Sequence, residues 1–231
     1  MEFSKRLDRQ FFWAVLVNVI GTLLAVTLAR KLAGNNGYLY ALIGSLWFIA
    51  LFTYEVTKYK TYLQKQWREF KQHIWLNLLL SFVTVVIVML VVVVARKFFN
   101  QFLPAHPLKE IMPPITTLSG ILANCYTGLV SVMIAVFEEI AFRHDMLYKY
   151  KDSRGLFCIL FVVTNLLFAM SHYYNFGGSF LATGPYALAG MIFTLLYMWR
   201  KNIWLPILAH FLFNAQSLIG AVALLIFKLM A

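Results

Sequence analysis

Long apolar runs separated by short charged segments govern what this chain can fold into. A helix that crosses the hydrocarbon core of a bilayer, roughly 30 Å thick, needs about 20 apolar residues. Windows that approach this requirement lie at residues 11–30, 37–56, 74–97, 119–147, 155–174, 182–200, 203–216 and 217–230. They use up most of the 231 residues, so no soluble domain fits beside them. We therefore predict an all-α polytopic membrane protein: a single domain over residues 1–231, built as a bundle of about eight transmembrane helices.

Composition and charge agree with a membrane chain. Apolar residues make up 61% of the sequence, charged residues make up only 13%, and the mean hydropathy is +0.74. A net charge of +11 would raise the question of a nucleic-acid partner in a soluble protein. Here the Lys and Arg residues fall mostly between the apolar runs, as expected for the basic loops of a membrane protein. We predict the lipid bilayer, and no nucleic acid, as the partner.

The distribution of basic residues also predicts the orientation. With the N-terminus in the cytoplasm, that side receives thirteen basic residues, in segments 5–9, 58–71, 149–154 and 200–201. The other side receives five, namely Arg30, Lys31, Arg96, Lys97 and Lys109. We therefore predict a multi-pass plasma-membrane protein with a cytoplasmic N-terminus. Eight spans would return the C-terminus to the cytoplasm beside Lys228.

Segment 58–73 mixes basic residues with aromatic and aliphatic ones. Such a segment can lie in the membrane interface with its basic side toward lipid phosphates. An ordinary charged extension of the two flanking helices explains the pattern equally well.

Two adjacent carboxylates stand within the fourth apolar run without ending it. A charged residue at membrane depth costs roughly 2.5–3.5 kcal/mol on insertion scales, so Glu138 and Glu139 must face a polar interior, find partners or serve a function. Glu139 and Arg143 have the spacing and order at which a carboxylate and a guanidinium pair best along a helix. We interpret that pair as mainly structural. Glu138 points about 100° away from Glu139.

Other polar residues follow the same pattern. Glu138 ends a polar stripe formed by Ser131, Thr127 and Asn124. Such residues also occur at ordinary helix contacts in membranes, but the carboxylate at the end of the stripe favours a hydrated cavity. His172 closes the fifth run, and His210 and Asn214, four residues apart, project from one face of the seventh. Each signal is weak alone; together they predict one site inside the bundle.

This set of residue types suits amide hydrolysis. A carboxylate and an imidazole can together remove a proton from water, which then attacks the carbonyl carbon. A second imidazole and an amide NH₂ can donate to the oxyanion, where one donor is worth roughly 100- to 1000-fold in rate. In a competing interpretation, Glu138, His172 and His210 bind a catalytic zinc ion, although the His-Glu-x-x-His signature of zinc proteases is absent. Zinc and a cofactor-free reaction both stay open.

At these residues the sequence resembles the CPBP intramembrane protease family, also called Abi, which includes the type II CAAX prenyl endopeptidases. The resemblance covers about residues 120–216 and is carried by Glu-Glu-x-x-x-Arg at 138–143, Phe-x-x-x-His at 168–172 and His-x-x-x-Asn at 210–214. It implies an intramembrane endopeptidase in which Glu138 and His172 activate water. His210 and Asn214 would stabilise the oxyanion, with Glu139 and Arg143 in support. The family includes members described as metalloproteases and members described as metal-free glutamate proteases.

The resemblance also implies membrane-associated peptides or lipidated protein C-termini as substrates. The short loops are similar to those of bacterial members, which are associated with maturation of secreted and signalling peptides and with bacteriocin immunity. We expect the cavity to open toward the cytoplasmic leaflet, because Glu138 and Arg143 approach the 149–154 loop. Two other classes remain: a non-enzymatic membrane immunity protein or partner of a peptide exporter, and a small proton-relaying transporter. We find no convincing inverted repeat for the transporter.

Overall fold

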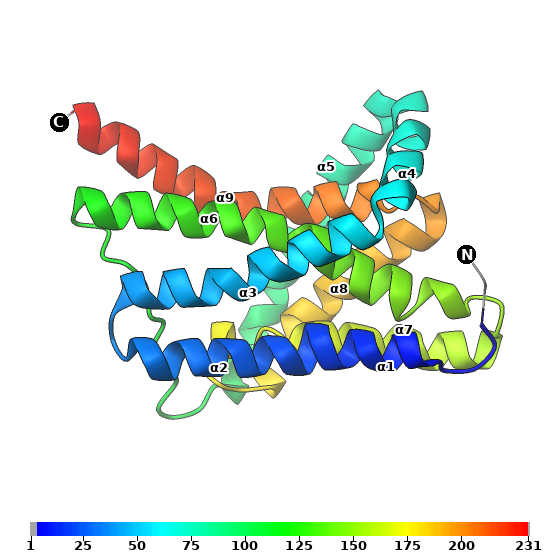
Figure 1. Cartoon of the computed structure of the whole chain (residues 1–231), viewed down its shortest axis with the longest axis horizontal. Coiled ribbons are helices and arrows are strands. Elements are labelled where there is room, and N and C mark those ends of the chain that lie inside the picture. Colours follow the sequence, from blue (N-terminus) through cyan, green and yellow to red (C-terminus); the bar gives the residue numbers. More distant parts are fainter. Residues whose placement is uncertain (1–3, 231) are drawn as a thin grey trace.

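The computed structural model describes residues 4–230, and within that range the secondary structure is helical (Figure 1). The α-helices are α1 Arg9–Val15, α2 Thr22–Ala33, α3 Gly37–Lys58, α4 Lys60–Gln72, α5 Ile74–Phe99, α6 Leu118–Glu139, α7 Arg154–Met170, α8 Gly184–Arg200 and α9 Trp204–Met230. Two π-helical segments, η1 Leu16–Gly21 and η3 Ile140–Asp145, continue α1 and α6. The 3₁₀ turns are η2 Asn100–Phe102, η4 Tyr148–Tyr150, η5 Tyr173–Phe176 and η6 Leu181–Thr183.

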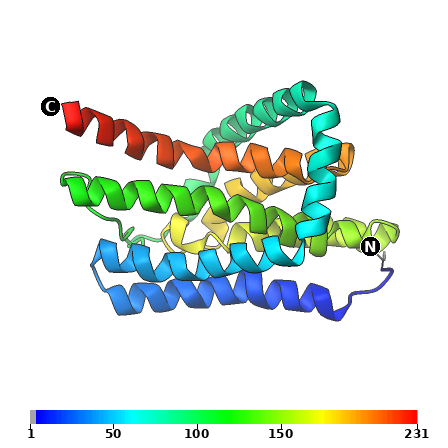
Figure 2. The ribbon, with the colours of Figure 1, turned by 45° about the horizontal axis from the view of Figure 1, so that its top comes forward.

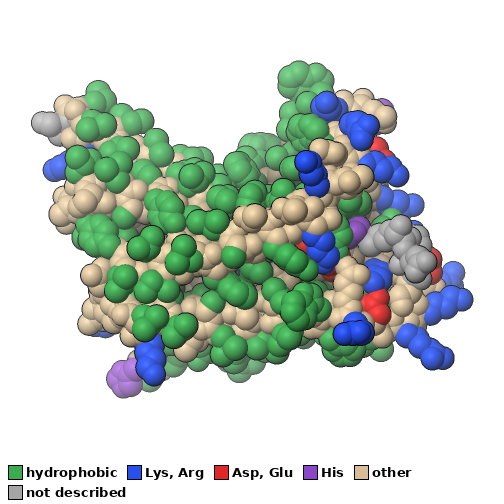
Figure 3. Space-filling model, in the orientation of Figure 1, with side chains coloured by type: hydrophobic (Ala, Val, Ile, Leu, Met, Phe, Trp, Pro, Cys, Tyr) green, Lys and Arg blue, Asp and Glu red, His purple; other side chains and the backbone are tan. Residues whose placement is uncertain are grey.

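Six helical segments of the described chain are long and apolar enough to cross a membrane. They are Arg9–Ala33, Gly37–Lys58, Ile74–Phe102, Leu118–Tyr150, Leu181–Arg200 and Trp204–Met230. The shorter apolar helix α7 lies among them. Many large apolar side chains are exposed, among them Leu24, Val94 and Phe227. Figure 3 shows hydrophobic side chains spread along the helices of the face in view. Lipid tails can cover such a surface, so the predicted all-α polytopic class is confirmed.

The prediction of about eight spans is wrong at the C-terminal end. The windows 203–216 and 217–230 form one continuous helix, α9. With α7 counted, seven segments of residues 4–230 run along the bundle, so the end of α9 lies opposite the start of α1 (Figure 1). The predicted return of Lys228 to the side of the N-terminus is therefore wrong as well.

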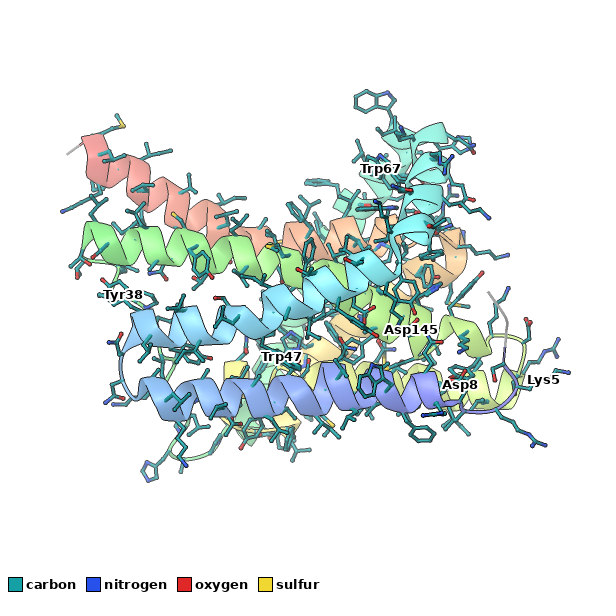
Figure 4. All side chains as sticks on the ribbon, viewed as in Figure 1. Lys5, Asp8, Tyr38, Trp47, Trp67 and Asp145 are labelled. Atoms are coloured by element: carbon teal, nitrogen blue, oxygen red, sulfur yellow. The ribbon has the colours of Figure 1, made fainter. Side chains whose placement is uncertain are left out.

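One end of the bundle collects most of the charge, and we call it the basic end. It comprises segments 5–9, 58–71, 149–154 and 200–201, and Figure 3 shows Lys and Arg gathered there. Figure 4 shows Lys5, Asp8 and Asp145 toward this end and Tyr38 toward the other. We call the other end the loop end; it comprises residues 34–36, 103–117 and 171–183.

Helix α4 crosses the basic end as a separate element rather than extending its neighbours (Figure 2). Its buried residues, Leu63, Gln66 and Phe70, face the protein, and its basic residues are exposed. The Trp204 indole donates to the Leu63 carbonyl over 2.9 Å, which ties α4 to the start of α9. The apolar face of α4 is thus taken up by protein contacts.

Helix α6 packs most extensively against α9, and a glycine allows the close approach. A Cβ added at Gly128 would lie 2.7 Å from the Cα of Leu218, closer than real contacts allow. This crossing sets the register in which the end of α6, with its carboxylates, faces His210 on α9. Small residues at such crossings let two helix backbones approach within membranes.

Candidate active site

The imidazole of His210 lies between the two carboxylates that end α6. Its Nδ1 is 2.9 Å from Oε1 of Glu139, and its Nε2 is 3.7 Å from Oε2 of Glu138. The first contact is a hydrogen bond, whereas the second is too long for one. Glu139 and His210 are almost completely buried, and Glu138 is 6% exposed. The predicted separation of the two carboxylates is therefore incomplete, because one ring touches both.

Arg143 holds the other oxygen of Glu139. Its Nε lies 3.1 Å from Glu139 Oε2, so the predicted pairing is confirmed, and both side chains are fully buried. Its Nη2 donates to the Gly190 carbonyl over 3.3 Å, and its Cζ lies 4.3 Å from the centre of the Phe168 ring. Arg143 belongs to the π-helical segment η3, a geometry often found at functional sites.

The cluster brings together two carboxylates, one guanidinium and one imidazole. A buried charge needs a partner of opposite sign, and Glu139 has that partner in Arg143. The His210 ring lies between the two carboxylates, with Nδ1 toward Glu139 and Nε2 toward Glu138.

His172 follows α7 and presents one nitrogen to the backbone. Its Nδ1 lies 2.8 Å from the carbonyl oxygen of Phe168 and 3.1 Å from Ser171 Oγ. Because a carbonyl only accepts, Nδ1 carries the hydrogen, and Nε2 of the neutral ring keeps its lone pair. The ring packs edge-on against Tyr186, with centroids 4.7 Å apart. His172 is therefore oriented as a hydrogen-bond acceptor through Nε2.

Asn214 lies one turn after His210 on α9 and binds back to α6. Its Nδ2 donates to the carbonyl oxygen of Ser131 over 2.8 Å. An amide nitrogen carries two hydrogens, so one donor remains after this contact. The side chain is half-buried.

A cavity of about 530 Å³ brings these elements together. Glu138, His172 and Asn214, from α6, the end of α7 and α9, all line it, together with Ser131. An adjoining cavity of about 570 Å³ shares Ser131 and is also lined by Asn124 and Thr127. The polar stripe on α6 therefore faces cavities, as predicted. His210 lies behind Glu138 and does not line the cavity wall.

The cavity does not open toward the 149–154 loop, so that expectation is wrong. Beyond Glu138 the chain toward the basic end is tightly buried: Phe142, Arg143 and Asp145 are each no more than 1% exposed. The other wall residues include Tyr40, Arg96, Tyr174 and Asn175, which lie at or near the loop end. The site is thus closed toward the basic end and hollow toward the loop end.

The zinc interpretation does not fit this arrangement. In the described part of the chain, no three His, Cys, Asp or Glu side chains are grouped so that they could hold a metal ion. The two nitrogens of His210 face the two carboxylates, so this ring does not turn a nitrogen into the cavity beside Glu138 and His172.

Two features of the site were not predicted from the sequence. The contact between Glu139 and His210 depends on the register of α6 against α9, which no local pattern encodes. Gly190 is the second: a Cβ there would lie 2.7 Å from Asn165 Oδ1 and 3.2 Å from Arg143 Nη2. Its only local signal was a glycine within an apolar helix, which often marks a close approach.

Comparison with known proteins gives one finding. The family model described as "Type II CAAX prenyl endopeptidase Rce1-like" matches residues 37–216. The match begins well ahead of segment 120–216, which carries the three motifs. Neither the curated proteins nor the solved structures gave a match.

Proposed function

This chain belongs to the type II CAAX prenyl endopeptidase Rce1-like family, whose members are proteases, and we propose that it hydrolyses membrane-associated peptides with water activated by Glu138 and His172. The observation that carries the proposal is the placement of Glu138, His172 and Asn214 on the wall of one cavity. Peptide maturation or bacteriocin self-immunity in a bacterial plasma membrane are the roles we propose for such an activity.

Water would be activated between the carboxylate and the imidazole. His172 Nε2 accepts one hydrogen bond and orients the water, while Glu138 takes the proton. Glu138 suits this task because its Oε2 has no hydrogen-bond partner among the described residues. The hydroxide oxygen then forms a bond to the peptide carbonyl carbon. A positioned general base of this kind contributes about 100- to 10,000-fold in rate.

The oxyanion would be stabilised by two donors from α9. Asn214 offers the amide hydrogen that is not used on Ser131. The second donor would be Nε2 of His210, which lies 3.7 Å from Glu138 Oε2 behind the cavity wall, so the oxyanion must form next to that carboxylate to reach it. Collapse of the tetrahedral intermediate breaks the C–N bond, and the proton held by Glu138 passes to the leaving nitrogen.

Purified protein in nanodiscs, incubated with a mixture of membrane-associated peptides, tests the proposal. Glu138→Ala and His172→Ala should each abolish cleavage while the protein elutes as a folded species. Glu69→Ala, at a half-buried site on α4 that does not line this cavity, is the control and should cleave normally. Elemental analysis and a chelator arm separate metal-dependent cleavage from metal-free cleavage. Unchanged cleavage in either active-site variant rejects the assignment. If the purified protein cuts no peptide, and the alanine variants still protect cells from a bacteriocin, the protein is a non-enzymatic immunity factor.

A further inference from the structure

The imidazole of His172 needs more than one restraint to do the work proposed for it. His172 stands just beyond the end of α7, whereas the other proposed catalytic residues belong to α6 and α9. Its Nδ1 bonds to the Phe168 carbonyl, which fixes one atom of the ring but leaves the plane free to tilt. Because the direction of Nε2 follows the plane of the ring, activation of water requires that the plane be fixed as well.

Two aromatic rings restrain that plane. The Phe168 ring lies edge-on to the His172 imidazole, with centroids 5.0 Å apart and planes at 61°. The Tyr186 ring reaches the imidazole from α8, with centroids 4.7 Å apart and planes at 73°. Edge-on ring pairs at such separations attract each other. The imidazole is therefore restrained both by the helix that precedes it and by α8.

Tyr186 is itself held by its neighbours. Its ring lies edge-on to Phe176, with centroids 4.9 Å apart, and to Phe213 of α9, with centroids 6.0 Å apart. Arg96 of α5 forms a hydrogen bond with the Tyr186 hydroxyl. Because a guanidinium only donates, the phenol oxygen accepts. The Cζ of Arg96 in turn lies 5.3 Å from the ring centre of Phe176, so the phenol is fixed along its ring and at its polar end.

A glycine at the start of α8 brings Tyr186 and Arg96 together. A Cβ added at Gly184 would overlap the ring of Phe99, at the end of α5. Glycine therefore lets these two helix ends pack closely. Tyr186 lies two residues after Gly184, and Arg96 lies three residues before Phe99, which is about one helical turn. The close approach of the helix ends thus places the phenol within reach of the guanidinium.

We propose that Tyr186 is a positioning residue of the reaction: with its hydroxyl anchored by Arg96, its ring fixes the plane of His172 so that Nε2 faces the attacking water. This inference rests on the proposed function for the reaction that it serves. Tyr186 and Arg96 line the same cavity as Glu138 and His172, and neither belongs to the three sequence motifs. A catalytic base whose direction is set by a third group is a recurring arrangement in enzymes.

Removing the ring and removing only its hydroxyl should have different effects. Tyr186→Leu takes the ring away from His172 and should lower kcat about 100-fold, with KM changed by less than about 2-fold, because a misplaced group slows the chemical step. Tyr186→Met, which fills more of the space, replaces it if Tyr186→Leu does not elute as a folded species. Tyr186→Phe keeps the ring and loses only the hydrogen bond from Arg96, so kcat should stay within about 10-fold of the wild type. If Tyr186→Phe is as slow as Tyr186→Leu, or if Tyr186→Leu changes KM alone, the proposal is wrong.

A double-mutant cycle tests the anchor. Arg96→Met removes the donor and keeps an unbranched apolar chain against Phe176, so its kcat should match that of Tyr186→Phe. The combined variant should be no slower than either single variant, because both changes remove the same hydrogen bond. Losses that multiply would mean that Arg96 acts on the reaction by another route, and they would overturn the proposed anchor.

The matched control is a second tyrosine of α8 that contacts a histidine. The Tyr197 hydroxyl lies 2.9 Å from Nδ1 of the buried His144, and Tyr197 does not line the cavity. Tyr197→Leu, or Tyr197→Phe if the larger change prevents folding, should lower the free energy of unfolding and leave kcat of the folded protein unchanged. If the control lowers kcat as Tyr186→Leu does, a general loosening of α8 explains both results and the positioning role is wrong.

The orientation of His172 is also measured without any cleavage. In protein labelled with ¹⁵N in the histidine rings, the signals that His172→Ala removes should show one neutral tautomer with its hydrogen on Nδ1. They should stay a single set in Tyr186→Phe and broaden or double in Tyr186→Leu. Unchanged His172 signals in Tyr186→Leu would overturn the proposal. A protein that cuts no peptide but gives the expected signals would refute the proposed protease function and leave the positioning of His172 by Tyr186 intact.

Discussion

Exchanging the two adjacent glutamates of α6 for glutamine, one at a time, should separate chemistry from folding. Glutamine keeps the size of the side chain and removes its charge. Glu139→Gln leaves Arg143 without its anion, 3.1 Å away in a fully buried place. Arginine cannot give up its proton in a protein, so the charge stays. Breaking a buried pair in this way costs about 3–5 kcal/mol, and we expect that loss in the free energy of unfolding.

Glu138→Gln should behave in the opposite way. Its Oε2 has no hydrogen-bond partner among the described residues, and the buried guanidinium of Arg143 is paired with Glu139 and not with Glu138. A neutral amide therefore removes a desolvation cost without stranding a charge. We expect a stability equal to or above that of the wild type, with kcat reduced about 100- to 10,000-fold because the general base is gone.

Denaturant titration in detergent micelles measures the free energy of unfolding, and single-turnover peptide cleavage measures the rate of the chemical step. Glu139→Gln should also lose up to about 100-fold in rate, because a misplaced His210 shifts groups at the site. The reasoning is refuted if Glu138→Gln destabilises the protein as much as Glu139→Gln does. It is also refuted if Glu139→Gln unfolds at the wild-type denaturant concentration.

Three further predictions concern the neighbours of the site and the basic end. Asn214→Leu should lower kcat about 100- to 1000-fold with little change in KM, because one oxyanion donor is lost; steady-state kinetics check this. Gly190→Ala should cost about 1–3 kcal/mol of stability and lower activity, since the added Cβ meets Asn165 and displaces Arg143. Denaturant titration checks this loss against the control Gly155→Ala, where the space around the added Cβ is open. Partial burial raises the pKa of Asp8, but hydrogen bonds from Lys149, the Phe11 N–H and Tyr150 outweigh it and hold that pKa below its usual value. The resulting stability is present above pH 4 and lost as the pH falls through the lowered pKa, so Asp8→Asn should flatten the acid side of a stability profile.

The apolar runs predicted most of the spans because the thickness of the bilayer sets the length of a helix that crosses it. They failed at the boundary between the windows 203–216 and 217–230, which α9 crosses at Gln216 and Ser217. In α9 the two polar side chains bond back to carbonyl groups three residues earlier, on Phe213 and Asn214. A glycine within a helix costs only about 1 kcal/mol, so local polarity did not end the helix.

Costly carboxylates in an apolar helix, and a His and an Asn four residues apart, pointed to side chains that the structure brings close together. Their catalytic roles stay predictions, and their arrangement was harder to predict. The position of His210 behind Glu138 depends on packing between α6 and α9, so sequence spacing could not place it. The direction in which the cavity opens was missed for a similar reason. The approach of Glu138 and Arg143 to the 149–154 loop suggested an opening there, but Arg143 and Asp145 are buried and close that side.

The central claim is that water attacks the peptide directly, with no covalent enzyme intermediate. Ser131 and Ser171 line the same cavity, so a serine nucleophile is the sharpest rival. Cleavage in H₂¹⁸O with hydroxylamine present, followed by mass spectrometry of the product, separates the two routes. Direct attack predicts a single ¹⁸O in the new carboxyl group, no hydroxamate, and no product from Glu138→Gln. A hydroxamate product that disappears in Ser131→Ala or Ser171→Ala would contradict the claim.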